Sequence, residues 1–145
     1  MSQFLRLALA VALFTSAAAC GGGTDTITAP TPSLGIPFST TDLVVGTGAE
    51  ALNGRRVVVN YTGWLYVTTT ADNKGTQFDT GNGFVRSVLG GGGVIVGFDR
   101  GIIGMRVGGR RRVVIPPELG YGSAASGAIP GNATLIFELE LISAQ

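Results

Sequence analysis

The sequence predicts an α+β domain in which an antiparallel sheet folds over one short helix. Several segments alternate apolar and polar residues with the period of two that a pleated strand requires. The 24 glycines among 145 residues favour turns and short strands over long helices. Hydrophobic residues make up 45% of the chain, which is enough to bury the core of a single domain.

The strands are expected in five segments. Residues 42–45 are typical of a strand that ends in the glycine turn at 46–48. Residues 55–66 also indicate a strand, in which Val57, Val59 and Tyr61 alternate with Val58, Asn60 and Thr62. Residues 68–75 are polar and predict a loop, after which residues 77–79 return to the sheet. The strand at 110–115 is closed by two prolines, which cannot donate to a ladder.

The last strand, at residues 134–142, alternates most clearly. One face carries Leu135, Phe137, Leu139 and Leu141, and the other carries Glu138 and Glu140. Such a pattern predicts a sheet with one buried and one solvated face. The single expected helix covers residues 97–104. Its spacing puts Phe98, Ile102 and Met105 on one side.

The first twenty residues have the pattern of an export signal. Arg6 supplies a positive charge, residues 7–14 are an apolar run too short for a membrane span, and small alanines precede Cys20. This resembles a bacterial lipoprotein signal, in which the cysteine becomes the lipidated first residue, although Ala17 stands where that signal usually has leucine. We therefore expect a signal peptide at 1–19 and a lipid anchor at Cys20.

Cleavage after Ala19 by an ordinary signal peptidase is the alternative, and it would leave a soluble exported protein with one free thiol. Residues 20–40 are small, polar and rich in proline, which indicates a flexible linker behind the anchor. The folded domain is expected at 41–145. The localisation that follows is a bacterial membrane, with the domain facing the periplasm or the cell exterior.

Two absences exclude whole classes of chemistry. The chain has no histidine, so Ser/His/Asp, Cys/His and His-ligated metal sites are excluded, and no metal or other cofactor is expected. Its one cysteine allows no internal disulfide. The formal charge is +1, and removal of residues 1–19 leaves nine basic and nine acidic side chains, so a nucleic-acid partner is not expected.

Two further patterns are discounted. The glycines at 90–93 are not followed by the Gly-Lys-Ser/Thr that a phosphate cradle needs. The three arginines at 110–112 lie in a predicted strand, where Arg110 and Arg112 share a face with Val114. A solvated sheet face explains them better than nucleic-acid binding.

Four motifs then show a family resemblance. The segments VVVNYTGWL, QFDTG, LGGGGVIVGFDRGIIGMRVGGRRRVVIPPELGYG and IPGNATLIFELELI resemble those of FKBP-type peptidyl-prolyl cis–trans isomerases, in that family's order and at nearly its spacing. Together they cover most of residues 42–145. The resemblance implies an antiparallel half-barrel wrapped around a short helix, in agreement with the pattern of strands.

The resemblance also implies a site. Its substrate-binding lining corresponds to Tyr61, Phe78, Val94, Ile95, Phe98, Tyr121, Ile129 and Phe137. The catalytic set corresponds to Asp79, Tyr121 and Tyr61. The proline ring would lie over Phe98, which stands where the family usually has tryptophan. The Tyr121 hydroxyl and the Ile95 N–H would donate to ligand carbonyls, and Asp79 would fix Tyr61.

Taken singly, each of these residues has an ordinary structural explanation. Phe98 and Phe137 would lie in the core of any sheet packed on a helix, the tyrosines suit an amphipathic rim, and Asp79 suits a turn. The loop between Phe78 and Leu89 is about three residues shorter than the family's usual loop. Strict alternation there puts Val85 at the pocket, whereas a bulge would put Phe84 there. Arg86 is a candidate for the family's loop arginine.

The function implied is isomerisation of X–Pro bonds in exported proteins. Such a mechanism suits a chain without histidine, because it needs an apolar pocket that favours the twisted amide and no nucleophile or metal. The expected partners are proline-containing clients, and the resemblance adds macrolides such as tacrolimus or rapamycin. A binding module with little turnover and a general chaperone remain as alternatives.

Overall fold

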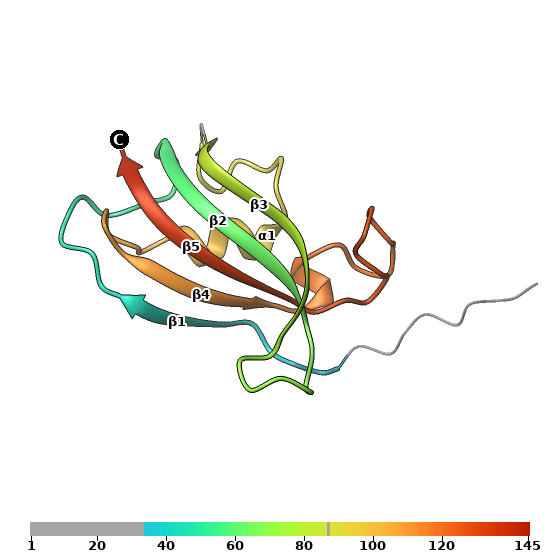
Figure 1. Ribbon diagram of the computed structural model, residues 1–145. Coiled ribbons are helices and arrows are strands. Elements are labelled where there is room, and N and C mark those ends of the chain that lie inside the picture. Colours follow the sequence, from blue (N-terminus) through green and yellow to red (C-terminus); the bar gives the residue numbers. More distant parts are fainter. Residues whose placement is uncertain (1–33, 87) are drawn as a thin grey trace, which may run out of the picture.

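The computed structural model describes residues 34–86 and 88–145. Its elements in chain order are β1 (Ser39–Val44), β2 (Val57–Tyr66), β3 (Lys74–Arg86), α1 (Val96–Ile102), β4 (Arg110–Ile115), the 3₁₀ helix η1 (Pro117–Leu119) and β5 (Leu135–Ala144). The strands form one antiparallel sheet in the order β1-β4-β5-β2-β3, and α1 lies behind it in Figure 1. The predicted α+β fold is confirmed.

Most strand bounds lie close to those that alternation predicts, but β3 runs from Lys74 to Arg86, so it extends well beyond the strand expected at 77–79 and includes the end of the loop expected at 68–75. Strand β4 coincides with the predicted segment, and β5 begins at Leu135. Strand β1 begins at Ser39, and Phe38 packs against the core, so the structured domain starts inside the segment assigned to the linker. The predicted signal peptide, Cys20 and the linker as far as residue 33 lie outside the described residues.

The core lies between the sheet and α1. Val57, Val59 and the leucines of β5 face it with at most 1% of their surface exposed. The inward set on α1 is also as predicted, because Phe98, Ile102 and Met105 are all buried. Ile136 is buried too, although alternation puts it on the outer face. The inner face is thus apolar, and the outer face carries the glutamates of β5.

Two glycines let α1 approach the sheet closely. Gly97 and Gly101 lie four residues apart, on the side of the helix that faces β4. A methyl group on Gly101 would lie 2.6 Å from Val113 Cγ2, and one on Gly97 would lie 2.9 Å from Ile115 Cγ1 and closer still to Cγ2. Only glycine therefore allows this helix position without displacement of β4.

The far end of α1 is held by Arg111. Its NH1 group donates to the carbonyl oxygens of Gly101 and Ile103, both at 3.1 Å, where the last turn of the helix leaves carbonyls unpaired. Its Nε and NH2 groups bind the carboxylate of Asp42 on β1 at 2.6 and 3.3 Å. One guanidinium thus ties the edge strand to the helix that carries Phe98.

Candidate active site

A cavity of about 140 Å³ opens between the sheet and the start of α1. Its lining combines aromatic and aliphatic side chains with one carboxylate. The residues are Tyr61, Asp79, Phe84, Gly93, Val94, Ile95, Phe98, Tyr121 and Phe137. Six separate parts of the chain therefore converge on one small, largely apolar hollow, which suits a ring the size of proline.

The aromatic rings of the cavity meet edge to face. The ring centroids of Phe98 and Tyr61 are 5.4 Å apart at 87°, and those of Phe98 and Phe137 are 5.3 Å apart at 84°. These separations and angles are the ones that aromatic quadrupoles favour. Phe98 and Phe137 are only 5% and 4% exposed, so they belong to the core and to the cavity at once.

Phe84 lies at the cavity because β3 carries a bulge. Val59 pairs with Phe84 and Tyr61 pairs with Gly81, so β3 has one more residue than β2 in this stretch. Gly83 takes φ = 67° within the bulge, and its N–H donates to Asn60 Oδ1 at 2.8 Å. The extra residue turns Phe84 inward, 5.6 Å from the Tyr61 ring, and leaves Val85 on the outside, 43% exposed.

Asp79 and Tyr61 form the polar side of the cavity. The Tyr61 hydroxyl donates to Asp79 Oδ2 at 3.0 Å, and Asp79 Oδ1 accepts the N–H of Thr80 at 2.8 Å. Burial raises the pKa of Tyr61 above its ordinary value, and the hydrogen bond and negative charge of Asp79 raise it further. Tyr61 is therefore a neutral donor at physiological pH, held by a carboxylate that is itself exposed.

Tyr121 also lines the cavity and is 40% exposed. It follows η1, whose chain reversal is fixed by the N–H groups of Gly120 and Gly122, which both donate to the Pro117 carbonyl. Val94 and Ile95 precede α1 and are half-buried. The tight turn after η1 and the segment before α1 thus supply three further lining residues of the cavity.

Two residues of the expected lining lie elsewhere. Phe78 packs behind Phe137, with ring centroids 5.5 Å apart at 83°, and does not border the cavity. Ile129 is 6% exposed and belongs to the core. Phe78 thus contacts the lining through Phe137, and Ile129 is part of the buried core. The side chain of Arg86 is outside the described part of the structure.

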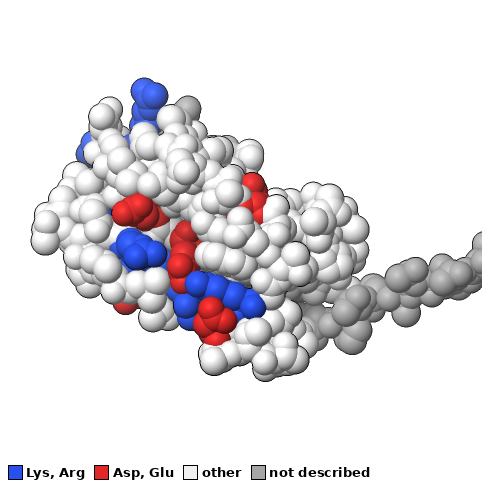
Figure 2. Space-filling view, in the orientation of Figure 1, with Lys and Arg blue, Asp and Glu red and all other residues white. Residues whose placement is uncertain are grey.

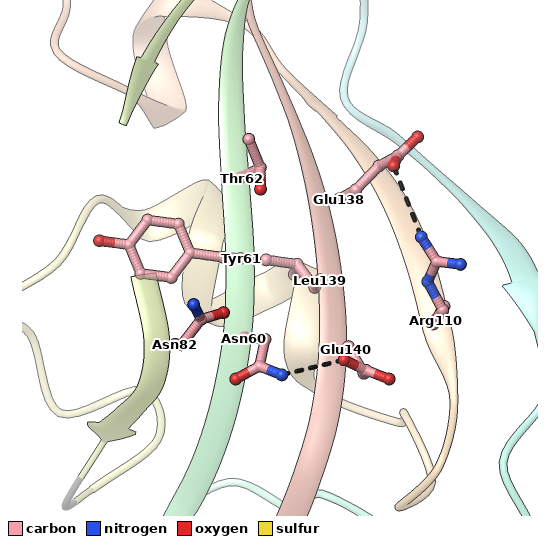
Figure 3. A pocket seen from close by; sticks show the side chains of 8 residues that line it. All are labelled: Asn60, Tyr61, Thr62, Asn82, Arg110, Glu138, Leu139 and Glu140. Carbon is pink, nitrogen blue, oxygen red and sulfur yellow. Dashed lines mark hydrogen bonds and ion pairs between the residues drawn. The ribbon is translucent and has the colours of Figure 1, made fainter. Parts of the chain in front are cut away.

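A larger hollow, of about 370 Å³, lies on the outer face of the sheet. Figure 3 shows the Tyr61 ring extending from β2 away from Glu138 and Arg110, while Asn60 reaches toward Glu140. The polar groups there bind each other, since Asn60 Nδ2 donates to Glu140 at 3.0 Å and Arg110 lies 3.9 Å from Glu138. The acidic and basic side chains interleave on this face in Figure 2, and most residues that line the hollow are polar or charged, which suits a proline ring poorly.

Within residues 34–86 and 88–145, no three histidine, cysteine or acidic side chains gather in a way that would hold a metal ion. In the same ranges no helix has the length and apolar character needed to cross a membrane.

Comparison with known proteins places this geometry in a family. Residues 48–142 match the model of the FKBP-type peptidyl-prolyl cis-trans isomerases. The chain belongs to this family of isomerases. An FK506-binding protein of Neisseria meningitidis serogroup B is 46% identical over 105 residues, which cover 70% of this chain and 90% of that protein. An FK506-binding protein 1 of Aspergillus oryzae is 41% identical over 103 residues, covering 67% of this chain and 89% of that protein.

Solved structures agree with the family and the fold. The crystal structure of AtFKBP13 aligns with a TM-score of 0.62 and 33% identity, over 74% of this chain and 93% of that one. The structure of FkpA from Escherichia coli aligns with a TM-score of 0.61 and 32% identity, over 81% of this chain and 52% of that one.

Proposed function

We propose that this FKBP-type domain catalyses rotation about X–Pro bonds by holding the proline ring in the aromatic cavity above Phe98. The observation that supports the proposal is the convergence of five aromatic rings, Val94 and Ile95 on a hollow that has one carboxylate at its edge. The cavity is open at the Tyr121 rim, where a peptide chain can enter and leave.

The physical basis is differential binding of the twisted amide. Amide resonance sets a barrier of about 18–20 kcal/mol to rotation. At the top of that barrier conjugation is lost, and the carbonyl is less polar than in the planar amide. An apolar wall of Phe98, Phe84 and Phe137 destabilises the polar planar amide more than the less polar twisted amide. The energy difference between the two states, which is the barrier, is therefore lower in the cavity.

Three polar groups orient the peptide in this account. The Tyr121 hydroxyl and the Ile95 N–H donate to carbonyls on either side of the proline. Asp79 keeps Tyr61 in place through the 3.0 Å hydrogen bond, and its negative charge lies beside the rotating carbonyl. None of these groups forms a covalent bond, which suits a chain that has no histidine.

Two-dimensional NMR exchange spectroscopy on an Ala-Leu-Pro-Phe peptide tests the proposal. The domain at micromolar concentration should accelerate cis–trans exchange, and Tyr121→Phe and Asp79→Leu should each slow it without abolishing it. Exchange at the uncatalysed rate, with the domain folded, would refute it.

A binding module with little turnover is the second candidate, and Phe98 favours it. Phenylalanine keeps the apolar floor but presents less area than the tryptophan usual in this family, and no N–H. In this case the cavity would hold proline-containing segments or a macrolide such as tacrolimus or rapamycin. Tight ligand binding with negligible catalysed exchange would select this candidate over the first.

We further propose that the domain acts on exported clients from a lipid anchor at Cys20. The support is the sequence alone, with its positive Arg6, short apolar run, small residues and single cysteine. Mass spectrometry of the mature N-terminus tests this. A diacylglyceryl-modified Cys20 is the expected result, and an unmodified residue 20 after cleavage would show a soluble exported form.

A further inference from the structure

A second hollow lies beside the aromatic cavity, on the helix side of the glycine rim. It has a volume of about 270 Å³. Its lining is mainly valine, isoleucine and glycine, with an arginine at its edge. The residues are Asn53, Gly90, Gly92, Val94, Val96, Asp99, Arg100 and Ile103.

The two hollows share a wall. Val94 lines both of them, so they are neighbours on the surface. The rim above that wall is built from glycines at 90–93, which place no side chain between the hollows. Gly90, Gly92 and Gly93 all have φ between 78° and 89°, a region that side chains disfavour. The glycines themselves therefore add no side chain to the path of a polypeptide between the two hollows.

The rim is held in this shape from below. Asp99 is 5% exposed and accepts the N–H of Gly90 at 2.9 Å. The carboxylate thus belongs to α1 and fixes the loop that separates the two hollows. Because the Asp99 carboxylate is buried and hydrogen-bonded, it is not the charge that a ligand meets at the exposed edge of the second hollow.

The exposed part of the second hollow is apolar and basic. Val96 and Ile103 are 53% and 38% exposed, on one side of α1. Arg100 lies between them in the sequence and is exposed. Arg100 makes no ion pair within the described residues, whereas Arg106, Arg111 and Arg112 each bind a carboxylate. An apolar side chain beside an acidic one complements this surface.

We propose that this hollow is a second subsite for the client chain, and that it takes an apolar residue next to an acidic one. The proposal rests on the proposed function, because the client is the polypeptide whose proline occupies the aromatic cavity. An extended segment of two or three residues spans roughly 7–10 Å, which sets the distance from the proline at which we expect this subsite to contact the client. Clients would therefore be selected by sequence beyond the X–Pro pair.

Peptides that carry an Ala-Leu-Pro-Phe core with a Leu-Glu or Ser-Gln pair two or three residues away, on either side, test the subsite. NMR exchange on the folded protein gives kcat and KM for each peptide. For one placement of Leu-Glu we expect KM about tenfold lower than for Ser-Gln, with kcat unchanged. Ile103→Ser should remove this preference, and Arg100→Gln should remove the part due to glutamate.

Matched controls separate the outcomes. Ile142→Ser makes the same substitution at a 45% exposed site on β5 and should leave the preference intact, as should Arg56→Gln. Equal KM values for all peptides, with catalysis of the core peptide present, would overturn the subsite and leave the proposed function standing. No catalysed exchange of any peptide would instead refute the proposed function, and Leu-Glu binding lost in Ile103→Ser would then still support the subsite.

Discussion

Replacement of Gly97 by alanine tests how closely α1 must lie against the sheet. The added methyl group would approach Ile115, with Cγ1 at 2.9 Å, Cδ1 at 3.0 Å and Cγ2 nearer than either. Ile115 is fully buried, so it has no room to move aside. Either β4 or α1 must shift, and Phe98 is the next residue along the helix.

The expected cost follows from two opposing terms. Overpacking of a filled core costs about 1–3 kcal/mol, and this overlap belongs at the upper end because it involves three buried atoms. Alanine in place of glycine gains at most about 1 kcal/mol in helix propensity. The net loss is about 2 kcal/mol, which lowers the melting temperature of a domain of this size by about 8 °C.

Chemical denaturation of four proteins measures the cost of the steric overlap directly. The proteins are the wild type, Gly97→Ala, Ile115→Ala and the double variant, and Ile115→Ala removes all three close atoms. Because the overlap exists only when both groups are present, the double variant should be about 2–3 kcal/mol more stable than the sum of the single losses. Additive losses, or a more stable Gly97→Ala protein, would show that α1 does not touch β4 as described.

Three other predictions concern charged and polar groups. Burial opposes the charged form of Glu138, but hydrogen bonds from Lys74 and Arg112 outweigh burial and hold the pKa of Glu138 below its ordinary value. Chemical denaturation should therefore show that Glu138→Gln loses about 1–2 kcal/mol of stability at pH 7, and this loss should shrink as the pH falls below about 4. A loss that persisted at low pH would contradict the stabilising role of these charged hydrogen bonds. Arg111→Lys should lose about 1–2 kcal/mol of stability in chemical denaturation, because an ammonium group cannot bind Asp42 and two helix carbonyls at once. An unchanged denaturation midpoint would refute the role of Arg111 in tying β1 to α1. Ultraviolet titration should show that the pKa of Tyr61 lies above 10. Because the folded state holds this proton more tightly than the unfolded state, the stability that Tyr61 contributes is present below pH 10 and is lost as the pH rises above it. Asp79→Leu should lower the pKa of Tyr61, and an unchanged pKa would exclude Asp79 as a cause.

Alternation predicts most of the sheet because each strand has one face against the core. Strand β4 and the inward face of β5 follow directly from it. The same rule misplaces Phe84, since one extra residue in β3 reverses every side chain beyond it. The signal was present in Asn82-Gly83, a pair that favours the left-handed conformation Gly83 adopts at φ = 67°.

Contacts between elements were beyond the reach of sequence patterns. The arginines at 110–112 were predicted to lie on a solvated face, and Arg110 and Arg112 do pair with Glu138 there. Arg111 points the other way and is only 12% exposed at its side chain, at the end of α1. Its role depends on where α1 ends in space, which is set by the packing of Gly97 and Gly101 on β4.

The residues of the aromatic cavity were also only partly predictable from the sequence. Tyr61, Asp79, Val94, Ile95, Phe98, Tyr121 and Phe137 come together as the family resemblance implies. Phe78 and Ile129 match the family pattern but do not border the cavity, and Phe78 instead packs against the ring of Phe137. A motif identifies which residues surround a site, whereas the packing order of their side chains decides which of them touch a ligand.

Titration of the ¹⁵N-labelled domain with an Ala-Leu-Pro-Phe peptide, while its cis–trans exchange is followed in the same sample, tests the central claim most directly. We predict catalysed exchange together with shifts of the backbone amides of Ile95, Phe98 and Tyr121, which surround the aromatic cavity. Shifts confined to Asn60, Asn82 and Glu140 around the outer hollow, or cavity shifts without any gain in exchange rate, would contradict the claim.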